Sequence, residues 1–224
     1  MNIALIGYGK MGRAIETIAL HRGHRITAII DVHNPEEWQS EGFRRADLAV
    51  EFTTPQTAVD NFYRCFDAGK PLVAGTTGWL ARLAEVKERC LAGNHTMFYA
   101  SNFSVGVNIL FAVNRYLAGL MTGFPEYEPR LREVHHVHKK DAPSGTALTL
   151  AEGIGRHAPV ESVREGEEPG FHEIVWESGV DLIRLSHGAK GREGFASGVV
   201  AAAEFTAGRS GFLGMEDMLG FSIH

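Results

Sequence analysis

Asn2-Ile3-Ala4-Leu5-Ile6-Gly7-Tyr8-Gly9-Lys10-Met11-Gly12 determines the architecture of the first half of this chain. Its first five residues form a short apolar run, which is typical of a parallel strand buried on both faces. A Gly-x-Gly-x-x-Gly motif follows, and Ile15, Ile18 and Ala19 then recur at helical spacing. Because the motif lies between a predicted strand and a predicted helix, it indicates a dinucleotide site.

The glycine motif has the spacing of a pyrophosphate-binding turn. Gly7 permits a tight turn, Gly9 lets the backbone approach a pyrophosphate, and Gly12 allows close packing of the helix. The free N–H groups of the first helical turn then face the phosphates. Arg25–Ile30 is the predicted second strand, and it delivers Asp31 to the position of an acid that binds the adenosine ribose. The alternative is a glycine-rich turn without a ligand.

Further short apolar runs continue this pattern. Leu48–Phe52 and Pro71–Ala74 are predicted to be buried strands, and each is followed by a polar, threonine-rich turn. Thr96–Ala100 supplies another strand, and segments with helical spacing separate these runs. Ligands of open α/β sheets bind over such strand ends. The alternation of strand and helix predicts a parallel sheet.

The pattern changes at Ser104. From Val105 onward, apolar residues recur every four positions, which predicts one long helix. Three later segments have strand-like composition without long helices between them, and these are residues 127–136, 171–178 and 180–187. This arrangement is typical of an open antiparallel or mixed sheet. A final helix, residues 195–207, is expected to pack back on the first domain.

These patterns predict an α/β protein with two domains. A Rossmann-like domain with a parallel sheet would bind the dinucleotide and would contain residues 1–103 and 194–224. An α+β domain with an open mixed sheet, residues 104–193, would bind the substrate. The length of 224 residues is sufficient for both domains to bury a core.

The charge distribution indicates a small anionic ligand. The formal net charge is −5, which does not favour a nucleic-acid partner. Locally, however, Arg130, Arg132, Lys139 and Lys140 gather around Glu133 alone. A cationic site on an acidic protein suggests a specific anionic substrate.

Simple features of the chain predict the compartment of the protein and the state of its cysteines. It starts without a cationic leader and contains no apolar run of about eighteen residues, so we expect a cytoplasmic protein without a membrane partner. Cys65 and Cys90 form no Cys-x-x-Cys pair and are expected to be reduced packing residues.

A second motif, which carries the candidate chemistry, is Glu133-Val134-His135-His136-Val137-His138-Lys139-Lys140-Asp141-Ala142-Pro143-Ser144-Gly145-Thr146-Ala147. It combines three imidazoles, two ammoniums and a predicted helix start. Pro143 disfavours a helical conformation in the residue before it, and Ser144 is a favourable N-cap. Together with Gly145 and Thr146, Ser144 is expected to present unpaired N–H groups and hydroxyls, which suit a carboxylate.

The histidines of this motif are candidates for proton transfer, because an imidazole has an unperturbed pKa of about 6.5. Period-two alternation in a strand places Glu133 and His135 on one face and His136 on the other. Zinc is the alternative, because histidine is a good zinc ligand. We expect no metal, since adjacent histidines would diverge on a strand and no cysteine lies nearby.

On these residues the chain resembles the 4-hydroxy-tetrahydrodipicolinate reductase family, also called the dihydrodipicolinate reductase family, of lysine and diaminopimelate biosynthesis. The motif from Glu133 to Ala147 is similar to the family motif throughout. Gly75-Thr76-Thr77-Gly78 and Asn102-Phe103-Ser104-Val105-Gly106-Val107-Asn108 look like its cofactor-side motifs. The similarity extends over nearly the whole chain.

The resemblance implies reduction of a cyclic, unsaturated imine dicarboxylate to tetrahydrodipicolinate with hydride from NADH or NADPH. His135 would be the general acid and Lys139 its partner in proton donation. The residues that would hold substrate are His136, Lys139, Ser144, Gly145, Thr146 and Arg192. The residues that would contact the cofactor are Gly7, Tyr8, Gly9, Lys10, Met11, Gly12, Asp31, Thr53, Gly75, Thr76, Thr77, Ala100, Ser101, Asn102 and Phe103. The family also implies a homotetramer assembled through the substrate domain.

Two departures from the family pattern affect the nucleotide side. Only sixteen residues separate Asp31 from Leu48, so a strand or helix beside the adenine pocket is expected to be trimmed. Glu51 stands where the family usually has aspartate. Asp31 disfavours a 2′-phosphate, whereas His33 and the pair Arg44–Arg45 would offset it, so the preference between NADH and NADPH stays open.

Two other functions are compatible with the glycine motif. A different Rossmann-fold dehydrogenase of a small carboxylate would keep the motif and use other substrate residues. A non-catalytic dinucleotide sensor would bind the cofactor without a proton donor beside a carboxylate site. The motif from Glu133 to Ala147 argues against both.

Overall fold

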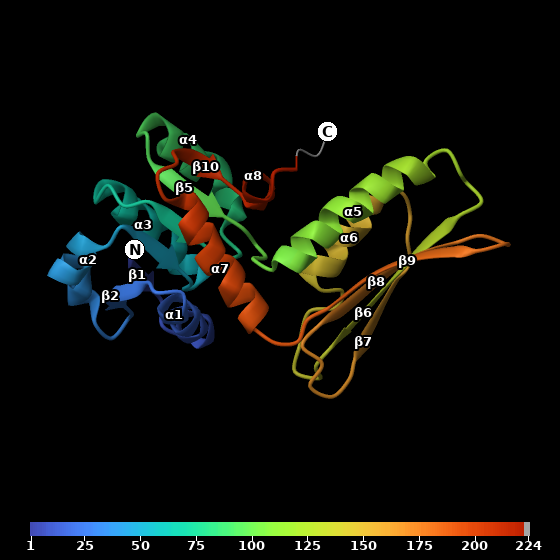
Figure 1. The fold of residues 1–224 in the computed structure, drawn as a ribbon, viewed down its shortest axis with the longest axis horizontal. Coiled ribbons are helices and arrows are strands. Elements are labelled where there is room, and N and C mark those ends of the chain that lie inside the picture. The colour runs from blue at the N-terminus through green and yellow to red at the C-terminus, as the bar shows by residue number, and fades with distance from the viewer. Residues whose placement is uncertain (222–224) are drawn as a thin grey trace. The chain divides into compact units, whose positions relative to one another are not determined.

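The computed structural model describes residues 1–221 and is drawn as a ribbon in Figure 1. The chain divides into two compact units. The first unit contains residues 1–103 and the chain from residue 195 to the end of the described part, and the second unit contains residues 104–194. The second unit is therefore an insertion in the first. Residues 222–224 of the predicted first domain lie outside the described residues.

The first unit is built on a six-stranded sheet with the order β10-β5-β4-β3-β1-β2, in which all neighbouring strands are parallel. The strands are β1 (Asn2–Ile6), β2 (Arg25–Ile30), β3 (Leu48–Glu51), β4 (Leu72–Ala74), β5 (Thr96–Tyr99) and β10 (Gly211–Leu213). The helices are α1 (Lys10–His21), α2 (Glu41–Arg45), α3 (Pro55–Asp67), α4 (Leu83–Ala92), α7 (Glu193–Thr206) and α8 (Met215–Leu219), with short 3-10 helices η1 (Pro35–Gln39) and η2 (Leu80–Arg82). The predicted Rossmann-like sheet is confirmed.

The strand order indicates where on this sheet a ligand binds. β1 lies between β2 and β3, so the chain moves to one side of β1 for β2 and to the other side for β3. Ligands of open α/β sheets bind at the carboxyl ends of the strands where the order reverses in this way. Ile3, Ala4 and Leu5 of β1 are almost completely buried, as expected for a central parallel strand.

The second unit is a four-stranded mixed sheet with two helices. The elements are α5 (Val105–Met121), β6 (Glu128–His135), α6 (Gly145–Ile154), β7 (Val160–Arg164), β8 (Phe171–Glu177) and β9 (Leu182–Gly188). The strand order is β7-β6-β8-β9, with β6 and β7 parallel and the other pairs antiparallel. Leu110 of α5 and Leu150 of α6 share a hydrophobic core with Leu131, Ile174 and Trp176 of the sheet. The predicted open mixed sheet is confirmed.

Two strands were not predicted. β7 and β10 are short, with five and three residues, and neither has the apolar alternation that identifies a longer strand. Between Asp31 and Leu48 the chain forms η1 and α2 and contains no strand. The short segment beside β2 is therefore helical.

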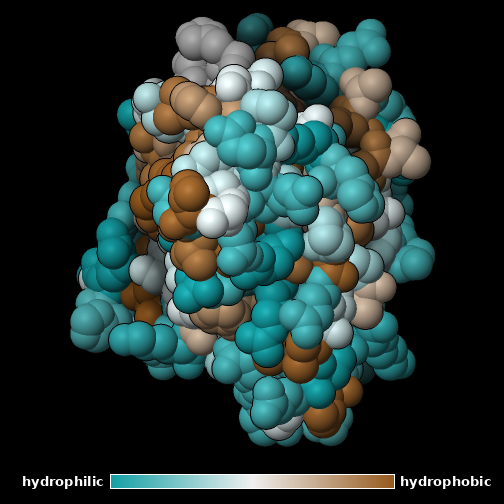
Figure 2. Space-filling model, turned by 90° about the vertical axis from the view of Figure 1, so that its right-hand side faces the viewer, coloured by the Kyte–Doolittle hydropathy of each residue, from teal (hydrophilic) through white to brown (hydrophobic). Residues whose placement is uncertain are grey.

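No helix in the described residues is both long enough and apolar enough to cross a bilayer. Hydrophilic side chains dominate the face of the molecule seen in Figure 2, and hydrophobic side chains lie scattered among them. Cys65 and Cys90 are both free and buried, in line with their expected packing role.

Candidate active site

Three glycines of the first turn have three different steric environments. Gly7 has φ +91°, and a Cβ there would lie 2.1 Å from the carbonyl oxygen of Phe52. A Cβ at Gly12 would lie 2.4 Å from the carbonyl oxygen of Gly7. A Cβ at Gly9 would meet nothing within 4 Å. Gly7 and Gly12 are thus required by the fold, and only Gly9 faces open space that a pyrophosphate can approach.

A pocket of about 410 Å³ lies at the carboxyl ends of β1, β2 and β3. Five residues of the predicted cofactor site line it, and these are Gly7, Tyr8, Gly9, Asp31 and Thr53. One carboxylate oxygen of Asp31 accepts the N–H of Tyr8 at 2.9 Å, and the other accepts the N–H of Val32 at 2.7 Å. These hydrogen bonds hold the glycine turn and the acid at the end of β2 together.

The other wall of this pocket consists of residues that the sequence patterns did not identify. Trp38 of η1 contributes to it, and so do Thr57 and Arg64 of α3. The guanidinium of Arg64 lies 5.2 Å from the centre of the Trp38 ring. His33, Arg44 and Arg45, which the sequence suggests as partners of a 2′-phosphate, do not line the pocket. Among the residues that line this pocket, Arg64 is the arginine.

The turns after β3 and β4 are joined by a buried carboxyl group. Glu51 is completely buried, and its Oε1 accepts hydrogen bonds from the hydroxyls of Thr53 and Thr76. The Thr76 hydroxyl also accepts the N–H of Thr53 at 2.7 Å. Burial raises the pKa of Glu51, and these hydrogen bonds oppose the effect only in part. Both hydrogen bonds of the Thr76 hydroxyl are therefore made to other groups of the protein.

The remaining predicted cofactor residues do not line the pocket. Ala100 and Phe103 are buried, and Phe103 packs against Phe52 and Phe98. A cofactor contact at Phe103 would therefore have to come from its backbone. Lys10, Thr77 and Ser101 are exposed, and Met11, Gly75 and Asn102 are half-buried.

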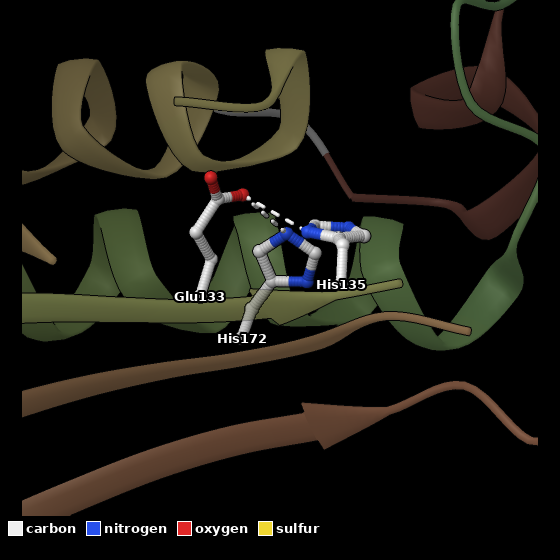
Figure 3. A group of neighbouring side chains, drawn as sticks. All are labelled: Glu133, His135 and His172. Carbon is white, nitrogen blue, oxygen red and sulfur yellow. Dashed lines mark ion pairs between the residues drawn. The ribbon is translucent and has the colours of Figure 1, made fainter. Parts of the chain in front are cut away.

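In the second unit, side chains from three strands converge on one carboxylate. Figure 3 shows His135 of β6 and His172 of β8 with their rings turned toward Glu133. The Oε2 of Glu133 lies 3.3 Å from Nδ1 of His135 and 3.7 Å from Nε2 of His172. Its Oε1 accepts hydrogen bonds from Arg164 of β7 at 3.1 Å and from the N–H of Ser144 at 3.0 Å. The predicted shared face of Glu133 and His135 is confirmed.

Burial and charge act in opposite directions in this cluster. Burial alone would raise the pKa of Glu133, but the hydrogen bonds from Ser144 and Arg164 outweigh it and lower the pKa to about 2. Burial lowers the pKa of His135, against the effect of the Glu133 charge. Burial, reinforced by His135, lowers the pKa of His172 to about 4. Glu133 is thus ionised and His172 neutral at physiological pH.

The three imidazoles of the motif do not form one group. β6 ends at His135, so the predicted strand extended one residue too far and His136 lies just beyond it. His136 is half-buried, and its N–H donates to the carbonyl of Glu168. His138 is exposed, with Nε2 3.4 Å from a carboxylate oxygen of Glu167. Only His135 is turned into the buried cluster, because a one-residue step past the strand end changes the direction of the side chain.

Lys139 and Arg192, the two predicted cationic residues of the site, are differently placed. Lys139 is half-buried and its Nζ lies 2.9 Å from a carboxylate oxygen of Asp141. Arg192 is exposed. Both partners lie in the loop between β6 and α6, so the ion pair restrains the Lys139 side chain within that loop.

The predicted helix start at Ser144 is confirmed, and one of its expected free groups is occupied. The Ser144 hydroxyl accepts the N–H of Ala147 at 3.2 Å, as an N-cap does. The N–H of Ser144 is not available for a ligand, because it donates to Glu133. Gly145 is exposed and a Cβ there would meet nothing within 4 Å, whereas Thr146 is half-buried. The open part of this helix start is therefore at Gly145.

Glu133, His135 and His172 also satisfy the distance condition for a metal site, because their ligand atoms lie within 4.8 Å of one another. This set differs from the three histidines that suggested zinc in the sequence. Arg164 places a permanent cation on the same carboxylate, which disfavours a dication there. The expectation of no metal stays a prediction, and metal analysis of the purified protein tests it.

Arg164 and His172 are the members of this cluster that the sequence did not reveal. The sheet register pairs Glu133 with His172 and His135 with Arg164. These partners lie in strands that are remote in sequence, so no local motif contains them. A correct strand alignment of β6, β7 and β8 is the one signal that identifies them.

Two family models match the chain. Residues 1–103 match the model described as dihydrodipicolinate reductase, N-terminus, and residues 106–219 match the one described as dihydrodipicolinate reductase, C-terminus. A protein from Christiangramia forsetii named 4-hydroxy-tetrahydrodipicolinate reductase is 40% identical over 98% of this chain and 98% of its own length. A protein of the same name from Archaeoglobus fulgidus is 31% identical, over 98% of this chain and its full length.

Solved structures agree in fold. The dipicolinate-bound dihydrodipicolinate reductase from Paenisporosarcina sp. TG-14 superposes with a TM-score of 0.77 at 21% identity, over 96% of this chain and 97% of that one. A probable dehydrogenase from Thermotoga maritima has a TM-score of 0.64 at 10% identity, over 97% and 92%. The two family models, the full-length relatives and the common architecture together show that this chain belongs to the dihydrodipicolinate reductase family, also named 4-hydroxy-tetrahydrodipicolinate reductase.

Proposed function

We propose that this chain reduces 4-hydroxy-tetrahydrodipicolinate, by way of dihydrodipicolinate, to tetrahydrodipicolinate with NADH or NADPH, in lysine and diaminopimelate biosynthesis. Membership of the reductase family supports the reaction. The observation that carries the proposal is the pairing of His135 with Glu133 directly beside the helix start at Ser144. A proton donor next to a carboxylate-binding helix start is what this reduction requires.

The nucleotide pocket fits a dinucleotide. Gly9 leaves the backbone open to a pyrophosphate, and Asp31 stands at the end of β2, where an acid binds the adenosine ribose. A bound dihydronicotinamide supplies the hydride. The chain's own task in the first unit is to orient that group, and the turns tied together by Glu51 are suited to it.

The second unit supplies the proton. Loss of water from the hydroxylated substrate gives a conjugated imine, and addition of hydride to it leaves an electron-rich enamine carbon. The imidazolium of His135 protonates that carbon, so that an N–H bond breaks, a C–H bond forms and the imidazole becomes neutral. Lys139, on the loop after β6, assists in proton donation and in binding.

The substrate carboxylates are held at the start of α6. The N–H groups of the first helical turn attract an anion there, and Gly145 leaves space for it. Thr146 and the side chains of His136 and Lys139 complete the binding set, with Ser144 as the helix cap. Arg192 is the further cation that we assign to the substrate.

The two units divide these roles. The first unit, which contains the predicted domain of residues 1–103 and 194–224, binds the dinucleotide. The second unit, which contains residues 104–193, binds the small dicarboxylate and carries the contacts of a homotetramer. The protein acts in the cytoplasm without a nucleic-acid or membrane partner, which agrees with its net charge of −5.

The decisive experiment is the loss of absorbance at 340 nm with freshly generated pathway substrate and each cofactor in turn. His135→Gln should lower kcat by roughly 10² to 10⁴ with little change in NADH binding, because it removes a general acid. His138→Gln, a matched change at an exposed histidine of the same motif, should leave kcat unchanged. No turnover by the folded wild-type protein with either cofactor would exclude the reaction, and full turnover by His135→Gln would exclude the role of His135.

A further inference from the structure

The Glu133 carboxylate contacts both parts of the proposed substrate site. Its Oε1 accepts the N–H of Ser144 at the start of α6, 3.0 Å away. Its Oε2 faces Nδ1 of His135 at 3.3 Å. A single buried carboxylate therefore connects the proton donor to the helix start that receives the substrate.

The groups around this carboxylate keep it fixed and ionised. Arg164 of β7 donates to Oε1 at 3.1 Å. On the other side, Nε2 of His172 lies 3.7 Å from Oε2 and 3.2 Å from the hydroxyl of Ser144. His187 of β9 stands opposite His172 in the sheet register. Because these partners belong to three different strands and a helix start, rotation of the Glu133 side chain would break contacts on all sides.

The two ring nitrogens of His135 have different surroundings. Nδ1 of His135 lies 3.3 Å from Oε2 of Glu133, and within residues 1–221 neither atom makes a hydrogen bond to any other group. Nε2 of His172 is the other ring nitrogen near this oxygen, at 3.7 Å. Nε2 faces Gly170, where a Cβ would lie only 3.1 Å from it. A carboxylate beside Nδ1 retains a proton on that nitrogen. Nε2 is left as the nitrogen that exchanges a proton.

We propose that Glu133 is a positioning residue for the reduction: it holds His135 in the Nδ1–H tautomer, directs Nε2 to the substrate, and fixes this donor relative to the start of α6. The inference rests on the proposed function. His172 supports the same orientation, because its ring packs edge-on against the His135 ring with centroids 5.0 Å apart and an interplanar angle of 73°.

Glu133 also widens the pH range in which His135 carries a proton. Burial lowers the pKa of His135, and the charges of Lys139 and Arg164 act in the same direction. Glu133 and Asp141 act against them. Loss of the Glu133 charge would lower the pKa of His135 further, so the protonated donor would be depleted at a lower pH.

The first test needs no variant of Glu133 and no catalysis. The imidazole ¹⁵N signals of labelled wild-type protein report the tautomer of each histidine, and His135→Gln identifies the signal of His135. We expect a protonated Nδ1 and an unprotonated Nε2 above the pKa of the ring. A neutral ring with the proton on Nε2 would overturn the proposal.

The second test compares two glutamates of the same sheet. Glu133→Gln keeps an oxygen for the N–H of Ser144 and removes the charge, so kcat should fall at least about 10²-fold while the KM for NADH stays unchanged. The fall of kcat at high pH should begin at a lower pH than in the wild type, and Glu133→Asp should restore part of the rate. Glu161→Gln, at an exposed carboxylate on β7, should behave as the wild type.

The outcomes separate the two proposals. If the folded wild-type protein reduces the substrate and folded Glu133→Gln keeps its kcat and pH profile, the positioning role is wrong and the proposed function stands. If the wild type does not turn over, the proposed function fails, while the ¹⁵N tautomer still reports whether Glu133 orients the ring. If Glu133→Gln does not fold, the wild-type tautomer decides alone.

Discussion

Each unit contains one glutamate that is completely buried in the described structure, and the two differ in their partners. Glu51 in the first unit receives hydroxyl hydrogen bonds from two threonines, and burial raises its pKa. Glu133 in the second unit receives a backbone N–H and a guanidinium, and its pKa falls to about 2. Two equally buried glutamates thus differ in role: Glu51 links two turns of the first unit, and Glu133 is a fixed negative charge in the second unit.

The contacts of a buried acid decide whether it keeps its charge. At Glu51 the hydrogen bonds only partly offset the effect of burial, whereas at Glu133 the hydrogen bonds, which include one from the Arg164 guanidinium, outweigh it. In the second unit, the charge of Glu133 acts to raise the pKa of the neighbouring His135.

The largest expected effect comes from removing the cation beside Glu133, which within the described residues leaves this carboxylate, like Glu51, without a permanently charged partner. Arg164→Gln removes the cation and leaves a buried charge without its partner, so the free energy of unfolding should fall by about 3 kcal/mol. Arg132→Gln, at an exposed ion pair with Glu161 on the same sheet, should change it by less than about 1 kcal/mol. Urea unfolding at pH 7 measures both variants. Equal losses of unfolding free energy in the two variants would show that Arg164 does not stabilise the buried charge of Glu133.

The second expected effect tests whether backbone geometry is what the first unit requires. Gly7→Ala combines a positive φ with a Cβ that overlaps the carbonyl of Phe52, so the free energy of unfolding should fall by about 2 kcal/mol. Gly9→Ala meets open space and should leave stability unchanged while weakening NADH binding. Thermal unfolding and NADH fluorescence titration measure the two properties. Similar losses of stability in both variants would contradict the assignment of Gly9 to the ligand.

The third effect concerns pH, and the two buried acids should respond with opposite sign. The folded-state pKa of Glu51 is raised from 4.5, so its contribution to stability falls as pH rises from 4.5 toward the raised pKa. The stability of Glu51→Gln should therefore rise relative to that of the wild type as pH rises. Unfolding measured from pH 4 to pH 8 checks this, and a constant difference across that range would contradict it.

Glu133 supplies the opposite case in the same titration. Its folded-state pKa is lowered to about 2, so it stabilises the fold above pH 4.5 and loses that contribution as pH falls toward 2. The free energy of unfolding of the wild type should therefore fall between pH 4.5 and pH 2, because Glu133 becomes protonated. The free energy of unfolding of Glu133→Gln should fall less over the same pH range.

The smallest effect is expected at the pocket wall formed by α3. Arg64→Gln removes the guanidinium beside Trp38 and should weaken NADH binding by about two- to fivefold, as the loss of one partly exposed cation–aromatic contact does. NADPH should lose more, because Arg64 is the pocket arginine available to a 2′-phosphate. The ratio of the two dissociation constants is the measurement. An unchanged ratio would place the 2′-phosphate elsewhere.

The sequence predicted what depends on neighbouring residues. The Gly7–Gly12 motif, the acid at Asp31 and the cap at Ser144 each depend on a few consecutive positions, because turns and helix starts are local structures. These elements are present as predicted. The same holds for the buried runs that form β1 to β5, whose apolar length is itself the signal.

The sequence did not predict what depends on strand register. Arg164 and His172 reach Glu133 only because β7 and β8 pair with β6 in one alignment, and a shift by one residue would turn each side chain to the other face. Arg64 was missed for a similar reason. Its place in the pocket depends on how α3 lies against the sheet, which helical spacing alone does not specify.

The insertion of the second unit has a consequence for synthesis on the ribosome. Residues 104–194 emerge as a continuous segment and can pair all four strands of their sheet before the rest of the chain exists. The six-stranded sheet must wait, because β10, its edge strand beside β5, comes from the last part of the chain. A nascent chain whose residues up to 194 have emerged from the ribosome can thus contain a complete second unit while the first unit still lacks β10.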